Sequence, residues 1–290
     1  MTEPSRRPVF AGQFYPAEGA ALTQMIEQNF LDPRGPGHLP VRHRSTERHI
    51  RAVVVPHAGY VYSGPIAAHA FAALAAERAP STILVLGVNH TGRGAPAALS
   101  TRDWETPLGV VPVDRDLVRA LDHRPIEADE AAHSREHSTE VELPFLQYVE
   151  PFPKFAALTV SMGPVGFLAD VAAVVQRAVR GRDVLLVASS DFSHYIPARK
   201  AQELDRLAID QIVGRDAPGL YSTVVDRDLS MCGVAPTTVL LFATQDEPLE
   251  GRLLRWGHSG EAEPMDEVVG YASLLLTSKV PLPPASPTAS

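Results

Sequence analysis

Five short runs of aliphatic residues, separated by stretches with helical periodicity, limit the fold of this chain more than any other feature. The runs are apolar at both odd and even positions, which is typical of strands buried on both faces of a sheet. They lie at residues 51–55, 83–86, 156–160, 184–187 and 271–276. This alternation predicts an α/β fold in which helices cover a largely parallel or mixed central sheet.

The stretches between the runs predict the covering helices. In residues 17–30, 65–78 and 167–180, apolar side chains recur every three or four positions. Pro197 suits the first residue of a further helix that runs to about residue 213. We expect one domain over residues 1–278, followed by a disordered Pro/Ser-rich tail at 279–290.

Composition excludes several classes of protein. The chain has 290 residues, which is enough to bury a core without disulfides or structural metals. Its formal net charge of −8 argues against a general nucleic-acid binder. No apolar run reaches the ~18 residues of a membrane span, and no secretory signal is visible. A single cysteine allows no internal disulfide, and we expect a cytoplasmic protein.

Three of the apolar runs are followed within a few residues by a histidine. His57 lies in PHAGYVYSG, His90 in GVNHTG, and His194 in ASSDFSH together with Asp191. Ligands of open α/β sheets bind outside the carboxyl ends of the strands. If these three strands are parallel, the histidines meet at one edge of the sheet, and we expect them to share a site.

The one cysteine, Cys232, lies in MCGVAPTTVLLFA, where Gly233 permits a close turn before an apolar helix. A thiol at a helix N-terminus has a lowered pKa and becomes a better metal ligand or nucleophile. The alternative is a small buried apolar residue, which is the usual fate of a free cysteine.

A second histidine pattern competes with this site. The sequence HSREH at 133–137 matches the H-x-x-E-H pattern of some zinc proteases, in which His133 and His137 would share a helix face with Glu136 as the base. Pro144 interrupts any long helix here. We keep this reading as an alternative.

Eight stretches, taken in order, resemble the Memo family, the protein B component of the AmmeMemoRadiSam system. They extend from about residue 6 to 276 and read RPVFAGQFYP, PHAGYVYSG, LGVNHTG, TPLGVVPVD, EHSTEVELPFLQ, SSDFSHY, CGVAPTTVLL and VVGYASLLL. The resemblance implies a fold similar to that of the class III extradiol dioxygenases, which are non-haem iron enzymes. In that comparison His57 and His90 look like metal ligands, and Cys232 stands where the dioxygenases place a carboxylate.

The resemblance also implies catalytic residues. His194 stands at the position of the acid/base histidine, and Asp191 and His137 match motif positions near the pocket. Asp191 would orient His194 or hydrogen-bond a ligand imidazole, and its alternative role is to cap a turn. No role is assigned to His258.

The implied function is a metal-dependent, dioxygenase-like oxidoreductase acting on an unknown small molecule. Fe(II) is the expected metal from the fold resemblance, while a thiolate ligand also suits Cu or Zn. Two alternatives stay open: a ligand- or peptide-binding signalling module that uses the same cleft without turnover, and a metal hydrolase. The expected partners are a small molecule or peptide and the radical-SAM and AMMECR-type proteins of the same system, with neither nucleic acid nor membrane.

Overall fold

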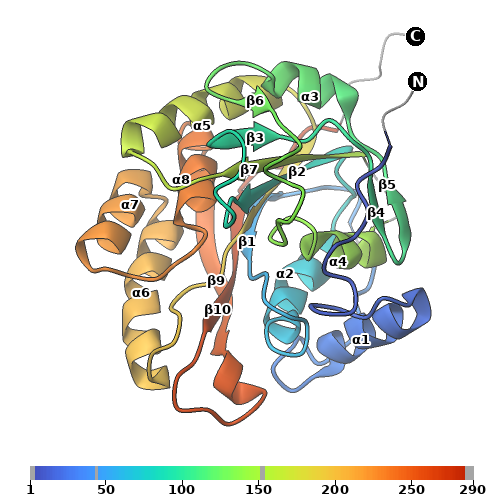
Figure 1. Ribbon diagram of the computed structural model, residues 1–290, viewed down its shortest axis with the longest axis vertical. Coiled ribbons are helices and arrows are strands. Elements are labelled where there is room, and N and C mark those ends of the chain that lie inside the picture. The colour runs from blue at the N-terminus through green and yellow to red at the C-terminus, as the bar shows by residue number, and fades with distance from the viewer. Residues whose placement is uncertain (1–3, 43–44, 151–153, 285–290) are drawn as a thin grey trace.

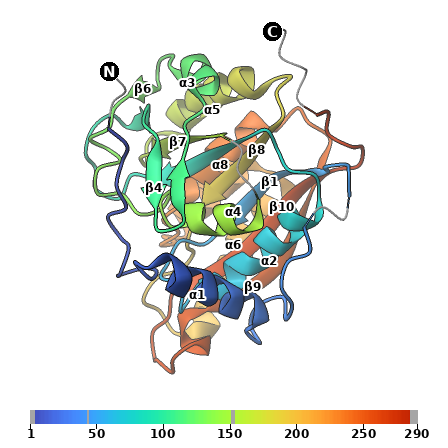
Figure 2. The same cartoon turned by 90° about the vertical axis from the view of Figure 1, so that its right-hand side faces the viewer.

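Four parallel strands form the centre of the sheet in the computed structural model, which describes residues 4–42, 45–150 and 154–284. Their order is β7-β2-β8-β1; Figure 1 labels β7, β2 and β1, and Figure 2 labels β8. The strands are β1 (Ile50–Val55), β2 (Thr82–Val88), β7 (Lys154–Val160) and β8 (Val184–Ser189). All their residues except Lys154 are buried. This agrees with the prediction from runs that are apolar at both odd and even positions. Four of the five predicted strands are therefore found in this parallel core.

Antiparallel strands extend the core on both sides and make the sheet mixed. The fifth predicted strand is β10 (Gly270–Ser278), which pairs antiparallel with β1 and with β9 (Leu249–His258). The connection between β9 and β10 holds only the short 3-10 helix Ser259–Glu261, and so compact a link favours an antiparallel pair. On the other side, β3 (Ala97–Leu99) pairs antiparallel with β7 and parallel with β6 (Glu127–Ala128). β4 (Trp104–Thr106) and β5 (Gly109–Val111) form a separate two-stranded sheet.

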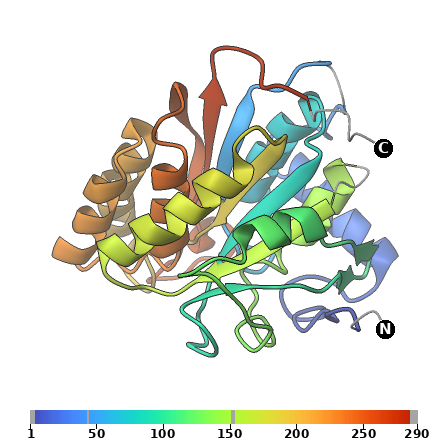
Figure 3. The same ribbon diagram turned by 90° about the horizontal axis from the view of Figure 1, so that it is seen from above.

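Helices cover both faces of the sheet, and the domain is a single α/β unit (Figures 2 and 3). One layer holds α1 (Gly19–Leu31), α2 (Gly64–Ala76) and α4 (Glu142–Val149). The other holds α3 (Arg115–Leu121), α5 (Val165–Val179), α6 (Ala198–Gly214), α7 (Ala217–Asp226) and α8 (Val234–Ala243).

The helices predicted from periodicity lie close to their expected bounds, with one difference at α6. Pro197 precedes that helix as its N-cap and is not its first residue, because its ψ of 140° is extended. The short helices α3, α4 and α7 carry too few turns for their periodicity to have been recognised in the sequence.

The first residues of the predicted tail contact the folded domain. The backbone N–H of Leu282 donates to the carbonyl oxygen of Arg48 at 2.7 Å, so this part of the tail contacts the body of the protein. Residues 285–290, on which the rest of that prediction falls, lie outside the described residues. In the described ranges, no helix combines the length and the apolar character that crossing a bilayer requires.

Candidate metal centre

The carboxyl ends of three neighbouring parallel strands bring the predicted histidines to one edge of the sheet. β2, β8 and β1 are adjacent, and His90, Asp191 and His57 each stand two residues beyond the end of their strand. Adjacent parallel strands end side by side, so the loops that follow them converge.

Cys232 reaches this edge from the loop before α8. Gly233 is the N-cap of α8, and a Cβ added there would lie 2.6 Å from the carbonyl oxygen of Ser189. The missing side chain thus lets the loop pack directly on the end of β8. The thiol Sγ of Cys232 lies 3.2 Å from Nε2 of His57.

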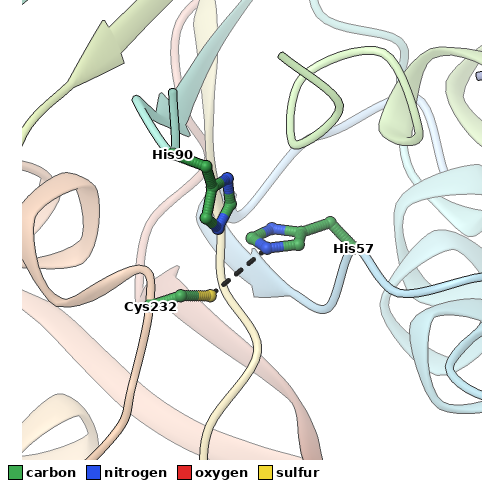
Figure 4. A group of neighbouring side chains, drawn as sticks. All are labelled: His57, His90 and Cys232. Atoms are coloured by element: carbon green, nitrogen blue, oxygen red, sulfur yellow. Dashed lines mark hydrogen bonds between the residues drawn. The ribbon is translucent and has the colours of Figure 1, made fainter. Parts of the chain in front are cut away.

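The three expected ligands form a compact group (Figure 4). One ligand atom each from His57, His90 and Cys232 lies within 4.8 Å of the others. The structure therefore brings together the residues named from the sequence, and their role as metal ligands stays a prediction.

Glu136 holds the imidazole of His90. Its Oε1 accepts from Nδ1 of His90 at 2.9 Å, and its Oε2 accepts from the backbone N–H of His90 at 2.7 Å. Burial alone would raise the pKa of Glu136, but the hydrogen bonds from His90 and from the backbone N–H of Ser138 outweigh burial and lower that pKa to about 2. The ionised carboxylate keeps the proton of His90 on Nδ1, which leaves Nε2 free to face the centre.

His57 is held from behind by Ser189. Nδ1 of His57 lies 2.7 Å from Ser189 Oγ, which in turn lies 2.8 Å from Glu142 Oε1. Burial, with the nearby His137 and His90, lowers the pKa of His57 well below its usual value, so this ring is a neutral imidazole. Burial also raises the pKa of Glu142 well above its usual value, although the hydrogen bond from Ser189 opposes this shift.

The pKa of the Cys232 thiol differs from the lowered value expected from the position of this residue before a helix. Burial and the nearby Asp191 raise the pKa of Cys232 well above its usual value, so the prediction of a lowered pKa is wrong. Loss of hydration and the neighbouring carboxylate outweigh the helix dipole. Without a cation the thiol keeps its proton, and a bound cation would supply the charge that favours the thiolate.

The HSREH segment does not build the zinc-protease site considered above. Residues 131–135 form turns and not a helix, so His133 and His137 do not share a helix face. His133 is fully buried, and its Nε2 lies 3.0 Å from the carbonyl oxygen of Ala98. His137 instead joins the candidate centre: its ring stacks on that of His90, with centroids 4.5 Å apart. Burial lowers the pKa of His137 to about 4, although Glu136 opposes this shift.

His194 stands beside the centre with its ring oriented by backbone carbonyls. Its Nδ1 lies 2.7 Å from the carbonyl oxygen of Phe192 and 2.8 Å from that of Ser230. Carbonyl oxygens only accept, so the proton of a neutral His194 is on Nδ1 and its Nε2 carries a lone pair.

Asp191 acts on the backbone of the ligand loop. Its Oδ1 accepts from the backbone N–H of His57 at 2.9 Å. Within the described residues no hydrogen bond joins this carboxylate to an imidazole, so the expected bond to His194 or to a ligand ring is not found. Burial raises the pKa of Asp191 to about 6, although the N–H of His57 opposes this shift. The partner, His57, is far away in the sequence, so this contact is not the local turn cap that was the alternative either. In the described part of the chain, His258 belongs neither to the group His57, His90 and Cys232 nor to the second cluster of possible metal ligands, His90, Glu136 and His137. It packs beside Trp256.

Sequence reasoning missed the residues that orient the ligands. The sequence indicates Glu136 only as a possible protease base, and it gives no indication of a role for Ser189 or Glu142. The one available signal for Glu136 was its place next to His137; Ser189 lies inside the SSDFSH segment and Glu142 inside a helix, without any distinguishing pattern.

Comparisons with known proteins agree with the resemblance. A family model described as Memo-like protein matches residues 6–275. A MEMO1 family protein of Methanothermobacter thermautotrophicus is 40% identical over 276 residues, which cover 93% of this chain and 99% of that protein. A MEMO1 family protein of Sulfurisphaera tokodaii is 38% identical over 280 residues, covering 93% and 98%. The crystal structure of an uncharacterized protein from Escherichia coli K12 is similar in fold, with a TM-score of 0.54 at 15% identity over 78% of this chain and 99% of that one.

Proposed function

The chain belongs to the Memo-like protein family, and from this premise we propose that it is a metal-dependent, dioxygenase-like oxidoreductase that acts on a small molecule. The observation that carries the proposal is the meeting of ligand atoms from His57, His90 and Cys232 within 4.8 Å of one another. They meet outside the carboxyl ends of parallel strands, which is where α/β proteins bind their ligands.

The residues present fit a transition metal. Ligands about 2.0 to 2.3 Å from one ion lie roughly 3 to 4 Å from each other, and the 3.2 Å between Cys232 Sγ and His57 Nε2 agrees with this spacing. Both imidazoles have their Nδ1 engaged, by Ser189 and by Glu136, so each offers its Nε2. Fe(II) is our first choice because of the fold resemblance, and Cu or Zn also suit a set of two nitrogens and one sulfur.

A bound redox-active metal would supply the electron-transfer chemistry. His194, with its Nδ1–H on backbone carbonyls, can accept a proton at Nε2 from a substrate hydroxyl. Asp191 keeps the His57 loop in place through the backbone N–H of that residue. The proposal places the protein in a reducing compartment such as the cytoplasm, because Cys232 must stay a free thiol to act as a ligand.

Elemental analysis tests the metal. We expect protein purified without oxygen after iron supplementation to carry about one equivalent of a transition metal. His57→Ala and His90→Ala should each lose it, while His123→Ala, at an exposed histidine next to α3, should keep it. Protein that holds no metal after this treatment, or whose metal content is unchanged by His57→Ala, would contradict the proposal.

Oxygen consumption tests the reaction. We expect an oxygen electrode to record uptake with a hydroxylated small-molecule substrate, and His194→Gln to abolish that uptake while keeping the metal. A metal-loaded protein that binds such molecules without consuming oxygen would instead be a binding module, and zinc with ester hydrolysis would indicate a hydrolase.

A further inference from the structure

A pocket of about 480 Å³ opens beside the candidate metal centre. It is lined by Val9, Phe10, Gln13, Thr91, Arg93 and Arg135. Thr91 directly follows His90, and the ring of Phe10 lies 5.4 Å from that of His137, which stacks on His90. The pocket therefore adjoins the metal centre on the side of His90.

The two arginines of this pocket are not neutralised by carboxylates. Among residues 4–42, 45–150 and 154–284, no carboxylate lies within ion-pair distance of Arg93 or Arg135. The acidic groups of the same loops are bonded elsewhere: Asp129 accepts from the backbone N–H groups of Ala95 and Ala131, each at 2.8 Å. Glu136 accepts from His90, and Glu140 pairs with Arg6. In a chain of net charge −8, two such arginines create a local positive field that favours an anion.

The loop that carries Arg93 is fixed before any ligand binds. Gly92 and Gly94 flank Arg93 with φ values of 63° and 69°, and a Cβ at Gly94 would crowd the carboxylate of Asp129. The carbonyl oxygen of Arg93 accepts from Nδ2 of Asn89 at 2.8 Å. Through Asp129 this loop is tied to the segment that leads to Arg135, so the two guanidinium groups start from preset backbone positions, which lowers the entropic cost of binding.

We propose that this pocket binds the anionic end of the substrate: a small organic anion whose carboxylate or phosphate lies between Arg93 and Arg135. Guanidinium groups bind both oxyanions through paired N–H donors. Val9 and Phe10 would pack against the apolar part of the molecule, which extends toward His137 and His90. The assignment of this anion as the substrate rests on the proposed function, whereas anion binding in the pocket can be tested without it.

Titration with simple anions tests the pocket. 4-Fluorobenzoate and inorganic phosphate are titrated separately by calorimetry into the wild-type protein, Arg93→Gln, Arg135→Gln and a control, Arg252→Gln, at an exposed arginine on edge strand β9. We expect each pocket variant to weaken binding at least tenfold, the control to leave it unchanged, and neutral 4-fluorobenzamide to bind far more weakly than the acid. Binding of only one anion identifies the substrate as a carboxylate or a phosphate ester. Equal affinity of the pocket variants and wild type, or of the amide and the acid, overturns the proposal.

Fluorine NMR tests the link between pocket and metal centre. In protein loaded with Co(II), we expect the fluorine signal of bound 4-fluorobenzoate to relax much faster than in protein loaded with Zn(II). His57→Ala, which should lose the metal, should bind the anion without this effect. If Co(II) binds and the arginine-dependent anion shows no enhanced relaxation, the pocket does not serve the metal centre and the proposal is overturned. If no Co(II) binds, the proposed function fails, while the arginine variants still decide whether the pocket binds anions.

Discussion

Glu136 accepts hydrogen bonds from Nδ1 of His90 and from the backbone N–H groups of His90 and Ser138, and its side chain is fully buried. All three partners are donors, so only a group that accepts through both of its terminal atoms satisfies them. A glutamine would turn its NH2 group toward at least one N–H, leaving two donors facing each other in a buried site. The charge of this residue, and not only its shape, therefore orients His90.

At this residue we expect Glu136→Gln to lower metal affinity by about 10- to 100-fold, because the imidazole of His90 loses its fixed orientation. Competition against a chromophoric chelator measures the change. Glu127→Gln, at an exposed glutamate in β6, is the matched control and should keep wild-type affinity. An unchanged affinity in Glu136→Gln would mean that His90 is oriented by other contacts.

At the scale of elements, α8 approaches the end of β8 more closely than any side chain at position 233 allows. A Cβ there would lie 2.6 Å from the carbonyl oxygen of Ser189 and still closer to the side chain of Ser190. Backbone atoms at the end of a buried strand cannot move aside without disturbing the strand. The position of Cys232 thus depends on how tightly a helix packs on a strand.

We expect Gly233→Ala to destabilise the fold by about 1 to 3 kcal/mol and to weaken metal binding, because the start of α8 must move away and carry Cys232 with it. Gly166→Ala in α5 is the matched control, since nothing lies within 4 Å of its added Cβ. That variant should be neutral or stabilised by up to about 1 kcal/mol. Urea unfolding and metal titration of both variants measure the two effects. Equal stability of the two variants would contradict the packing argument.

The opposite end of β8 is held by an ion-pair cluster. Asp183, just before the strand, pairs with the buried guanidinium of Arg48 and, at 2.7 Å, with Arg78. Burial alone would raise the pKa of Asp183, but the hydrogen bonds and charges of the two arginines outweigh it and lower that pKa. The folded state therefore binds the proton of Asp183 less readily than the unfolded state does.

We expect Asp183→Asn to cost about 3 kcal/mol near pH 7, because it leaves the buried Arg48 without its counter-charge. A lowered folded-state pKa contributes stability that is fully present above the ordinary aspartate pKa of about 3.9 and is lost as the pH falls through the lowered pKa. The difference between wild type and variant should therefore shrink below about pH 4. Urea unfolding at several pH values measures it, and a pH-independent difference would show that packing, and not charge, is lost.

At the scale of the whole molecule, the candidate centre joins segments that are distant in sequence. His57, His90 and Cys232 follow different elements, and any ion they share would bind the folded chain in preference to the unfolded one. Binding that is selective for the folded state raises its stability by mass action.

We expect Zn(II) or Fe(II) at a hundredfold excess over its Kd to stabilise the protein by about 2.7 kcal/mol, which raises the melting temperature by about 5 °C. Anaerobic differential scanning calorimetry with and without the metal measures the shift. The shift should vanish in the double variant His57→Ala/His90→Ala, and a shift that survives there would place the metal elsewhere in the chain.

Local sequence patterns were sufficient for much of the fold. Runs that are apolar at both odd and even positions predicted the core strands, because such strands are buried on both faces of the sheet. Apolar residues at every third or fourth position predicted α1, α2 and α5, because these helices are buried on one face. The direction of β10 was not predictable in this way, because an apolar run looks the same whichever way its strand runs. β3 and β6 were also missed, being too short to show a pattern.

By itself the sequence determined which strands are followed by histidines, and it predicted that His57 and His90 lie at one edge of the sheet on the condition that those strands are parallel. Only the tertiary structure decided what surrounds those rings: that Glu136 binds His90, that Asp191 binds the backbone of His57, and that burial raises the pKa of the Cys232 thiol. The physical reason is that a strand and its following residue are neighbours in the chain, whereas hydrogen-bond partners and desolvation come from segments whose meeting depends on the packing of the whole domain.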